Sequence, residues 1–214
     1  MRPTIMRRIL FLAILFSATA VLPAHAQFSQ PSPTHFKDTS MIKPPFGAKV
    51  AIWEFEDMEC PSCAHAYPIV HEAARKYNIP IVRHDFPLGP MHPWSFEAAV
   101  NARYIQDTLK NPSLAEQYRG AVFAAQNGIS SPSDLRNFTL HFAATHGIQW
   151  PFAVDPQQHL AARVKEDRAL GDRIGLQETP TIWVVTNRGI QQVQDVSTLY
   201  QVIDAAFATV GGKR

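Results

Sequence analysis

Cysteine is scarce in this sequence, which contains only Cys60 and Cys63 among its 214 residues. A disulfide between them would close a loop too short to constrain the unfolded chain much, so the pair can add little stability. A four-cysteine zinc site is excluded, because it needs a second pair of cysteines. The two cysteines are therefore better explained by chemistry than by stabilisation of the fold.

The sequence also lacks a strong excess of either charge. It carries 20 Lys and Arg against 18 Asp and Glu, and the first 26 residues hold three of the Arg and no acidic residue. Without that segment, 188 residues (214 − 26) carry 17 basic side chains (20 − 3) against 18 acidic ones, a net charge of −1. A balance so close to zero indicates neither a nucleic-acid-binding protein nor one held on an anionic membrane surface.

Long hydrophobic runs are absent after the first 26 residues. Within that segment, arginines precede an apolar run over residues 9–22, and Ala24 and Ala26 fit the small-x-small pattern of a cleavage site. The apolar run is shorter than the roughly 20 residues that a helix needs to span a bilayer. We therefore expect residues 1–26 to be the cleaved signal peptide of an exported, periplasmic protein. The alternative is an uncleaved membrane anchor.

Proline, glycine and asparagine divide the rest of the chain into short elements. Residues 27–46 contain four prolines and are expected to form an irregular leader, with a short strand near residues 36–40. Hydrophobic spacing then predicts, in order, a strand over 49–55, a helix from Cys60 to about Tyr77, a strand over 81–86, helices over 95–110, 113–126, 133–146 and 157–174, strands over 181–185 and 190–193, and a helix over 197–210.

This order of elements predicts an α/β fold with a central mixed sheet flanked by helices. The first strand, helix and strand form the unit that joins two parallel strands, and the last two strands flank a turn that is typical of an antiparallel hairpin. We expect residues 47–93 and 175–210 to form the sheet domain and residues 94–174 to form a helical domain inserted between its halves.

The four residues Cys60-Pro61-Ser62-Cys63 place one thiol at the start of a predicted helix and the other one turn later. The free N–H groups and the dipole of a helix N-terminus stabilise negative charge, so we expect Cys60 to be the attacking thiolate and the more buried Cys63 to resolve the mixed disulfide. Pro61 stiffens the first turn, and Ser62 can add a weak hydrogen bond but no positive charge. This arrangement is typical of thiol–disulfide exchange.

Other interpretations of the two cysteines stay open. Attachment of a c-type haem is excluded, because Ala64 stands where that motif needs a histidine. Zinc could bind the two cysteines together with His65 and His71, copper could bind them with a histidine, and a short structural disulfide would have no chemistry at all.

Thr179-Pro180 favours the redox interpretation. Pro180 lies 117 residues after Cys63 (180 − 63) and opens a predicted strand, where a proline must sit at a sheet edge or a bend. A cis peptide bond at this position would leave the backbone of Thr179 free to pair with a bound substrate strand. An ordinary trans proline at an edge strand is the alternative.

Glu54 also favours the redox interpretation of the two cysteines, because this acid lies inside an apolar strand, six residues before Cys60. Strand alternation places Glu54 on the same face as Ile52, where a covering helix would bury it. A buried carboxyl group has a raised pKa and can exchange a proton with Cys63, whereas a Glu54 that reaches solvent cannot. Asp57 either positions the motif loop or is a solvated turn residue.

With these features the chain resembles the DsbA-like thiol:disulfide oxidoreductases of the thioredoxin superfamily. The resemblance spans roughly residues 47–210. It is carried by E-F-E-D-M-E-C-P-S-C at residues 54–63, R-H-D-F-P-L at residues 83–88, M-H-P at residues 91–93 and E-T-P-T at residues 178–181. It implies a thioredoxin fold with an inserted helical domain.

The resemblance also implies roles for individual residues: a nucleophilic Cys60, a cis Pro180 and a buried Glu54. Ser62 departs from the best-known oxidases of the family, which carry histidine between the cysteines. The loss of a positive neighbour is expected to raise the pKa of Cys60 and to make the disulfide less oxidising.

We therefore expect an exported, monomeric enzyme that oxidises reduced or unfolded exported proteins, with Thr179, Pro61 and Ser62 in contact with the substrate. The resemblance implies a membrane-bound partner that reoxidises the dithiol. No metal and no organic cofactor are expected. The alternatives are a disulfide isomerase or reductase, and a copper chaperone or a binding module on the same fold.

Overall fold

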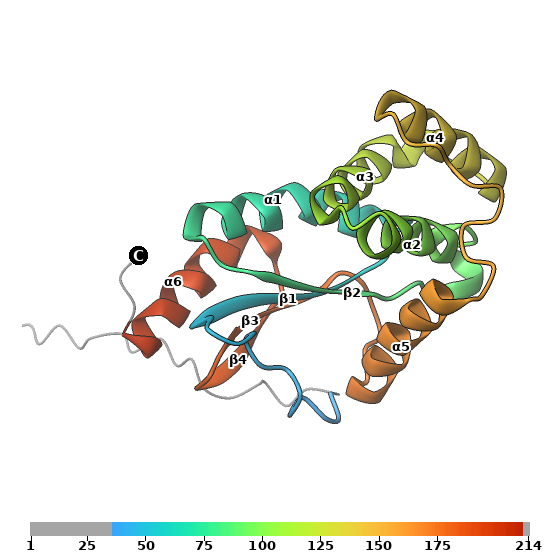
Figure 1. The fold of residues 1–214 in the computed structure, drawn as a ribbon. Helices are drawn as coiled ribbons and strands as arrows, with labels where there is room; N and C mark the ends of the chain where they lie inside the picture. Colours follow the sequence, from blue (N-terminus) through green and yellow to red (C-terminus); the bar gives the residue numbers. More distant parts are fainter. Residues whose placement is uncertain (1–35, 212–214) are drawn as a thin grey trace, which may run out of the picture.

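The computed structural model describes residues 36–211 and consists of a four-stranded sheet with helices on both faces (Figure 1). The elements are β1 (Val50–Glu56), α1 (Pro61–Tyr77), β2 (Ile81–Asp85), α2 (Ser95–Arg103), α3 (Pro112–Ala125), α4 (Pro132–Thr145), α5 (His159–Ile174), β3 (Thr181–Thr186), β4 (Gly189–Val193) and α6 (Leu199–Val210). The expected signal peptide and the first part of the expected leader lie outside the described residues. Among residues 36–211, none of the helices has the length and apolar character that a bilayer crossing requires.

The sheet has the strand order β2-β1-β3-β4, so β1 is a central strand, and all of its residues are buried. β1 runs parallel to β2, with Ile52 opposite Ile81, and antiparallel to β3, with Trp53 opposite Trp183. β3 and β4 form an antiparallel hairpin. The expected α/β fold with a mixed sheet is confirmed.

The alternation of side chains along β1 gives the sheet two separate apolar faces. On one face, Ile52 packs in a core with Val70 of α1 and Ile203 of α6. On the other, Phe55 packs in a core with Trp183 of β3 and with side chains from α5 and from the segment before β1. Figure 1 shows α1 and α6 together on the first face and α5 beyond the sheet from them.

The segment before β1 contains no strand at residues 36–40, so that expectation is wrong. The segment finds its partners elsewhere: the N–H of Lys37 donates to the carbonyl of Ile174 at the end of α5, at 2.7 Å. Ile42 is buried in the core that contains Trp53 and Phe55. Residues 36–46 therefore form neither helix nor strand, and they cover part of the sheet face that α5 leaves open.

The helices between β2 and β3 have a core of their own. Tyr118 of α3 is fully buried and exchanges a hydrogen bond with Thr139 of α4 at 2.8 Å, and Asn101 of α2 donates to the Tyr118 hydroxyl at 3.4 Å. Cys60 and Cys63 belong to the same core. The dithiol therefore lies where the helical segment meets the sheet.

The helix expected over residues 95–110 is divided in the structure. α2 ends at Arg103, and Tyr104–Thr108 form a π-helical turn in which the N–H of Leu109 donates to the carbonyl of Tyr104 at 3.0 Å. The helix expected from residue 157 begins later, because Gln158 has a φ of 58° and stands outside the helical region.

Candidate functional site

Cys60 is the residue that immediately precedes α1. Its extended backbone (φ −79°, ψ 122°) makes it the N-cap, Pro61 takes the first helical position, and the first turn contains no acidic residue. The sulfur therefore lies at the positive end of the helix dipole, with no carboxylate of α1 beside it. Pro61 and Ser62 are exposed and form the outer rim of the motif, whereas Cys63 is buried one turn into the helix.

The two thiols are both reduced in the structure, and their pKa values are displaced in opposite directions. The pKa of Cys60 falls from 9.0 to about 5, chiefly because the Cys63 thiol hydrogen-bonds to its sulfur, with further stabilisation from the backbone N–H groups of Cys63 and Ser62. Burial raises the pKa of Cys63, and its hydrogen bond to Cys60 raises it further. Cys60 is thus a thiolate at neutral pH while Cys63 keeps its proton.

Thr179 and Pro180 lie beside the dithiol although they are far from it in the chain. The Cys60 thiol lies 3.2 Å from the carbonyl oxygen of Thr179, to which it can donate when protonated. The Thr179–Pro180 peptide bond is cis, as the family resemblance implied. Thr179 is buried and Pro180 is half-buried. These two residues, which lead into β3, form a wall on one side of the Cys60 sulfur.

Glu54 is buried in the middle of β1, with only 1% of the residue exposed, so the solvent-exposed alternative is wrong. Both carboxyl oxygens lack a hydrogen-bond partner among the described residues, and Arg83 approaches one of them at 3.7 Å. Burial, and then the nearby charge of Glu56, raise the pKa of Glu54 to about 8. Glu54 can therefore hold a proton at neutral pH, while its transfer to Cys63 stays a prediction.

Glu56, the last residue of β1, lies in a buried network of charges. Its carboxylate is 2.7 Å from Arg119 of α3 and 3.1 Å from Arg83 of β2. Arg119 also binds Asp85 at 2.7 Å, and Arg103 of α2 binds the other oxygen of Asp85 at 2.7 Å. The positive charges of these guanidinium groups offset the cost of burying the carboxylates of Glu56 and Asp85.

A pattern in the two strands could have indicated this network. Glu54 and Glu56 share one face of β1, and Arg83 and Asp85 stand directly opposite them on the parallel β2. Charged side chains that are buried on the same face of two neighbouring strands must find partners inside the protein. The contributions of α2 and α3 carry no such local signal, because their arginines are brought in by tertiary packing.

Asp57 positions the motif loop, which decides between its two expected roles. Its buried carboxylate accepts hydrogen bonds from the N–H of Glu59, the N–H of Leu88 and Nδ1 of His92, each at 2.7 Å. Its own N–H donates to the sulfur of Cys63 at 3.5 Å. Asp57 thus joins the motif loop, the loop after β2 and the Cys63 thiol.

Gln126 and Glu59 also hold this loop, through three hydrogen bonds that no pattern in the sequence indicated. The Gln126 amide, just after α3, donates to the carbonyls of Met58 at 2.9 Å and Cys60 at 3.1 Å. The carboxylate of Glu59 accepts from the N–H of Trp94 at 2.8 Å. The reactive loop is therefore fixed from the helical segment as well as from the sheet.

Metal ligands do not gather in the part of the chain that the structure describes: within residues 36–211, no group of three or more His, Cys, Asp and Glu side chains could hold an ion. His71, one of the ligands considered for zinc, instead contacts Arg83 at 2.8 Å and Glu116 at 3.2 Å. Burial lowers its pKa to about 4. His65 is exposed on α1.

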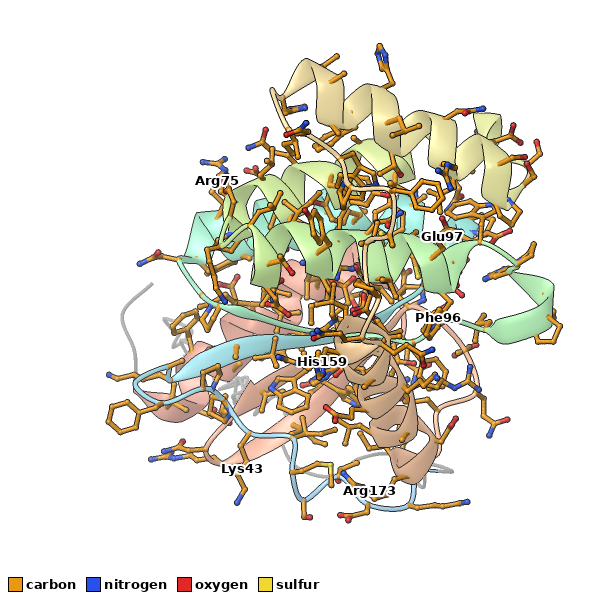
Figure 2. All side chains as sticks on the ribbon, turned by 45° about the vertical axis from the view of Figure 1, so that its right-hand side comes forward. Lys43, Arg75, Phe96, Glu97, His159 and Arg173 are labelled. Carbon is orange, nitrogen blue, oxygen red and sulfur yellow. The ribbon has the colours of Figure 1, made fainter. Side chains whose placement is uncertain are left out.

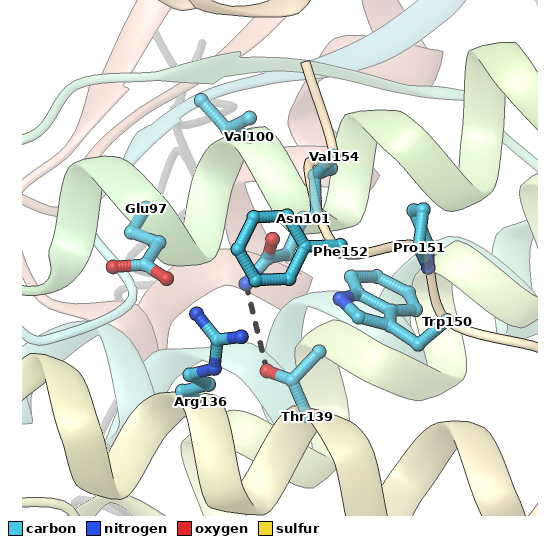
Figure 3. A pocket seen from close by; sticks show the side chains of 9 residues that line it. All are labelled: Glu97, Val100, Asn101, Arg136, Thr139, Trp150, Pro151, Phe152 and Val154. Atoms are coloured by element: carbon cyan, nitrogen blue, oxygen red, sulfur yellow. Dashed lines mark hydrogen bonds between the residues drawn. The ribbon is translucent and has the colours of Figure 1, made fainter. Parts of the chain in front are cut away.

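A cavity of about 170 Å³ lies within the helical segment (Figure 3). Trp150 and Phe152 contribute aromatic rings to its lining, and Asn101 donates to Thr139 at 3.5 Å where α2 faces α4. Its lining contains no cysteine and no histidine. The cavity therefore offers no group for thiol chemistry.

The sequence of this chain is similar to known proteins over most of its length. The family described as thioredoxin matches residues 45–205. The Na(+)/H(+) antiporter NhaA 1 of Salinispora arenicola (strain CNS-205) is 27% identical over 172 residues, which make up 80% of this chain and 25% of that protein. The chain thus spans about a quarter of the length of this curated relative.

Solved structures resemble the fold at low sequence identity. The thiol-disulfide exchange protein alpha-DsbA2 of Wolbachia pipientis has a TM-score of 0.60 and 16% identity, over 76% of this chain and 84% of that one. Proteus mirabilis ScsC in a transitional conformation has a TM-score of 0.59 and 15% identity, over 78% and 71%. These likenesses confirm the expected thioredoxin fold.

Proposed function

This chain belongs to the thioredoxin family, and on that premise we propose that it is a thiol:disulfide oxidoreductase that oxidises protein substrates through Cys60 and Cys63. The observation that carries the proposal is the opposite displacement of the two thiol pKa values. A stabilised Cys60 thiolate favours the reduced enzyme, so the corresponding disulfide readily accepts electrons from a substrate.

The proposed reaction begins with the Cys60–Cys63 disulfide. A substrate thiolate attacks the sulfur of Cys60, an S–S bond forms between them, and the Cys60–Cys63 bond breaks with its electron pair on Cys63, which takes up a proton. A second substrate thiolate then attacks the substrate sulfur of the mixed disulfide, and Cys60 leaves as a thiolate. The substrate dithiol loses two electrons, and the enzyme disulfide gains them.

The surroundings of the dithiol support both steps. A thiol with a pKa of about 5 is a good leaving group in the second step. The buried Glu54, with a pKa of about 8, can supply the proton that Cys63 takes up in the first. We expect an extended substrate segment to lie along Thr179 and Pro180 beside the Cys60 sulfur, and to contact the exposed Pro61 and Ser62.

The proposal includes export, because residues 1–26 have the composition of a signal peptide. It also includes a membrane-bound partner that reoxidises the dithiol. Cell fractionation and N-terminal sequencing test this part. The protein should appear outside the cytoplasm with Gln27 as its first residue. A chain that keeps Met1 in the soluble cytoplasmic fraction would contradict export but would leave the dithiol chemistry untouched.

The direct test of the reaction is the oxidation of a reduced, unfolded model protein by the full chain. Wild-type protein, first oxidised to its Cys60–Cys63 disulfide, should form the disulfide of the model protein, whereas Cys60→Ala and Cys63→Ala, which cannot form the enzyme disulfide, should not. Undiminished activity of Cys60→Ala would reject the mechanism. A reduction potential near the cytosolic glutathione poise, about −220 to −260 mV, would favour the reductase alternative, and a clearly higher one the oxidase.

A further inference from the structure

A groove beside the motif loop has no part in the chemistry described so far. It has a volume of about 440 Å³ and lies between the loop that follows β2 and one side of α5. Pro87, Pro90 and Pro93 line it together with the ring of Phe96 from α2, which Figure 2 labels. Rigid proline rings give an apolar wall that loses little conformational entropy when a partner binds.

The groove is held in place by contacts that do not depend on a ligand. A guanidinium nitrogen of Arg168 donates to the carbonyl of Pro87, and its guanidinium group lies over the ring of Phe86, 4.2 Å from the ring centre. On the other side of the loop, the N–H of Leu88 donates to the buried carboxylate of Asp57. The groove is therefore preformed and anchored from both α5 and the motif loop.

The same anchors connect the groove to the dithiol. His92 lines the groove and binds the Asp57 carboxylate, and Asp57 in turn contacts the sulfur of Cys63. Trp94, at the end of the loop, donates to Glu59, which immediately precedes Cys60. The loop that lines the groove is therefore hydrogen-bonded to Asp57 and Glu59, which lie within three residues of Cys60.

The rim of the groove is positively charged. Lys165 is exposed on α5 and makes no ion pair among the described residues, and the partly exposed Arg168 lies one turn along the same face. Asp172 pairs with Arg168 at 3.1 Å but does not line the groove. Apolar walls beside an unneutralised cation fit a partner that presents an apolar side chain next to an acidic one.

We propose that this groove binds a segment of the protein substrate next to its reactive cysteine, with an apolar side chain among the prolines and an acidic side chain beside Lys165. The proposal rests on the proposed function, because it assigns part of the substrate specificity of the same dithiol. It predicts that sequence around the substrate cysteine, and not only accessibility, controls the rate.

The test uses reduced peptides that contain two cysteines and a Phe-Glu step, placed before the cysteines in one series and after them in the other. Each series includes a version with Phe replaced by Ser and one with Glu replaced by Lys. The loss of the enzyme disulfide is followed by acid quench and mass spectrometry. Every rate is divided by the rate of the same enzyme with dithiothreitol, which corrects for changes in the dithiol itself.

In at least one series, wild-type protein should react with the Phe-Glu peptide about two to five times faster than with the Phe-Lys peptide, the range expected for an exposed ion pair. Lys165→Glu should reverse this preference. Lys49→Glu is the matched control, because it makes the same charge change at an exposed residue before β1, at the end of the sheet away from the groove. It should keep the wild-type preference for the Phe-Glu peptide.

Equal normalised rates for all three peptides of both series would overturn the groove proposal while leaving the proposed function intact. No oxidation of dithiothreitol above the uncatalysed rate would instead reject the proposed function. The proposal would also be overturned if the wild-type protein sedimented as a dimer and Lys165→Glu sedimented as a monomer, because a second copy of the chain would then occupy the groove.

Discussion

The backbone N–H of Asp57 donates to the sulfur of Cys63 at 3.5 Å, while the carboxylate of the same residue accepts three hydrogen bonds. This arrangement makes the position of the Cys63 thiol depend on a buried acid, which has no role of its own in the proposed reaction. Asp57 is therefore a positioning residue.

Asp57→Asn tests this role. Leu88 and His92 donate to one oxygen of Asp57 and Glu59 donates to the other, so the amide, with a single acceptor oxygen, cannot accept from all three. The free energy of unfolding should therefore fall by about 1–3 kcal/mol, the cost of leaving a buried donor without a partner. The rate at which Cys63 resolves a mixed disulfide on Cys60 should fall as well. Urea unfolding and single-turnover measurements check the two effects. Glu166→Gln, an exposed control on α5, should change neither, and an unaltered resolution rate in Asp57→Asn would contradict the positioning role.

The pKa of Cys60 predicts how the stability of the reduced protein depends on pH. Because this pKa is lowered from 9.0 to about 5, the thiolate stabilises the folded reduced protein fully above pH 9, and the effect disappears as the pH falls through 5. The disulfide form has no thiolate to respond. Between pH 5 and pH 9 the melting temperature of the reduced protein should therefore rise relative to that of the oxidised protein and relative to that of Cys60→Ser, because neither of these has the Cys60 thiolate.

The pKa of Glu54 predicts the opposite dependence. It is raised from 4.5 to about 8, so the stability that the neutral carboxyl contributes is complete below pH 4.5 and is lost as the pH rises through 8. Glu54→Gln removes the charge and keeps the shape. Relative to wild type, its free energy of unfolding should increase from pH 4 to pH 9, by on the order of 1 kcal/mol or more. A difference that stays flat with pH, as expected for exposed Glu178→Gln, would show that Glu54 does not titrate in this range.

Arg119 predicts a large and specific loss of stability. Arg119→Met leaves the buried carboxylates of Glu56 and Asp85 each short of a cation, which should cost about 3–5 kcal/mol of unfolding free energy. Arg163→Met is the matched control. Its side chain is 56% exposed and lies 3.8 Å from Asp107, so its loss should stay below about 1 kcal/mol. Denaturant unfolding compares the two, and similar small losses would mean that the network does not stabilise the fold.

Local patterns in the sequence were sufficient to place the chemistry of the motif. The position of Cys60 at a helix start followed from Pro61 and the helical spacing after it, and the burial of Glu54 followed from the alternation of an apolar strand. The mixed sheet followed from the order of the elements. Each of these inferences needs only residues that are close together in the chain.

The partners that fix the site could not be predicted in the same way. Glu56 binds Arg119, which is 63 residues away, and Gln126 reaches the carbonyl of Cys60 from 66 residues away. Their contacts depend on how α3 packs against α1, which no periodicity in either helix specifies. For the same reason the sequence did not choose between the two expected roles of Asp57.

The buried charges also constrain how the protein can be re-engineered. The acids, Glu56 and Asp85, belong to the strands, whereas Arg119 and Arg103 belong to the helices between β2 and β3. Charge balance inside the sheet is thus completed by a segment that looks, from its place in the chain, like an exchangeable module. A chimera that replaces this segment with helices from another protein must bring two arginines to the same places, or replace the two acids with apolar residues.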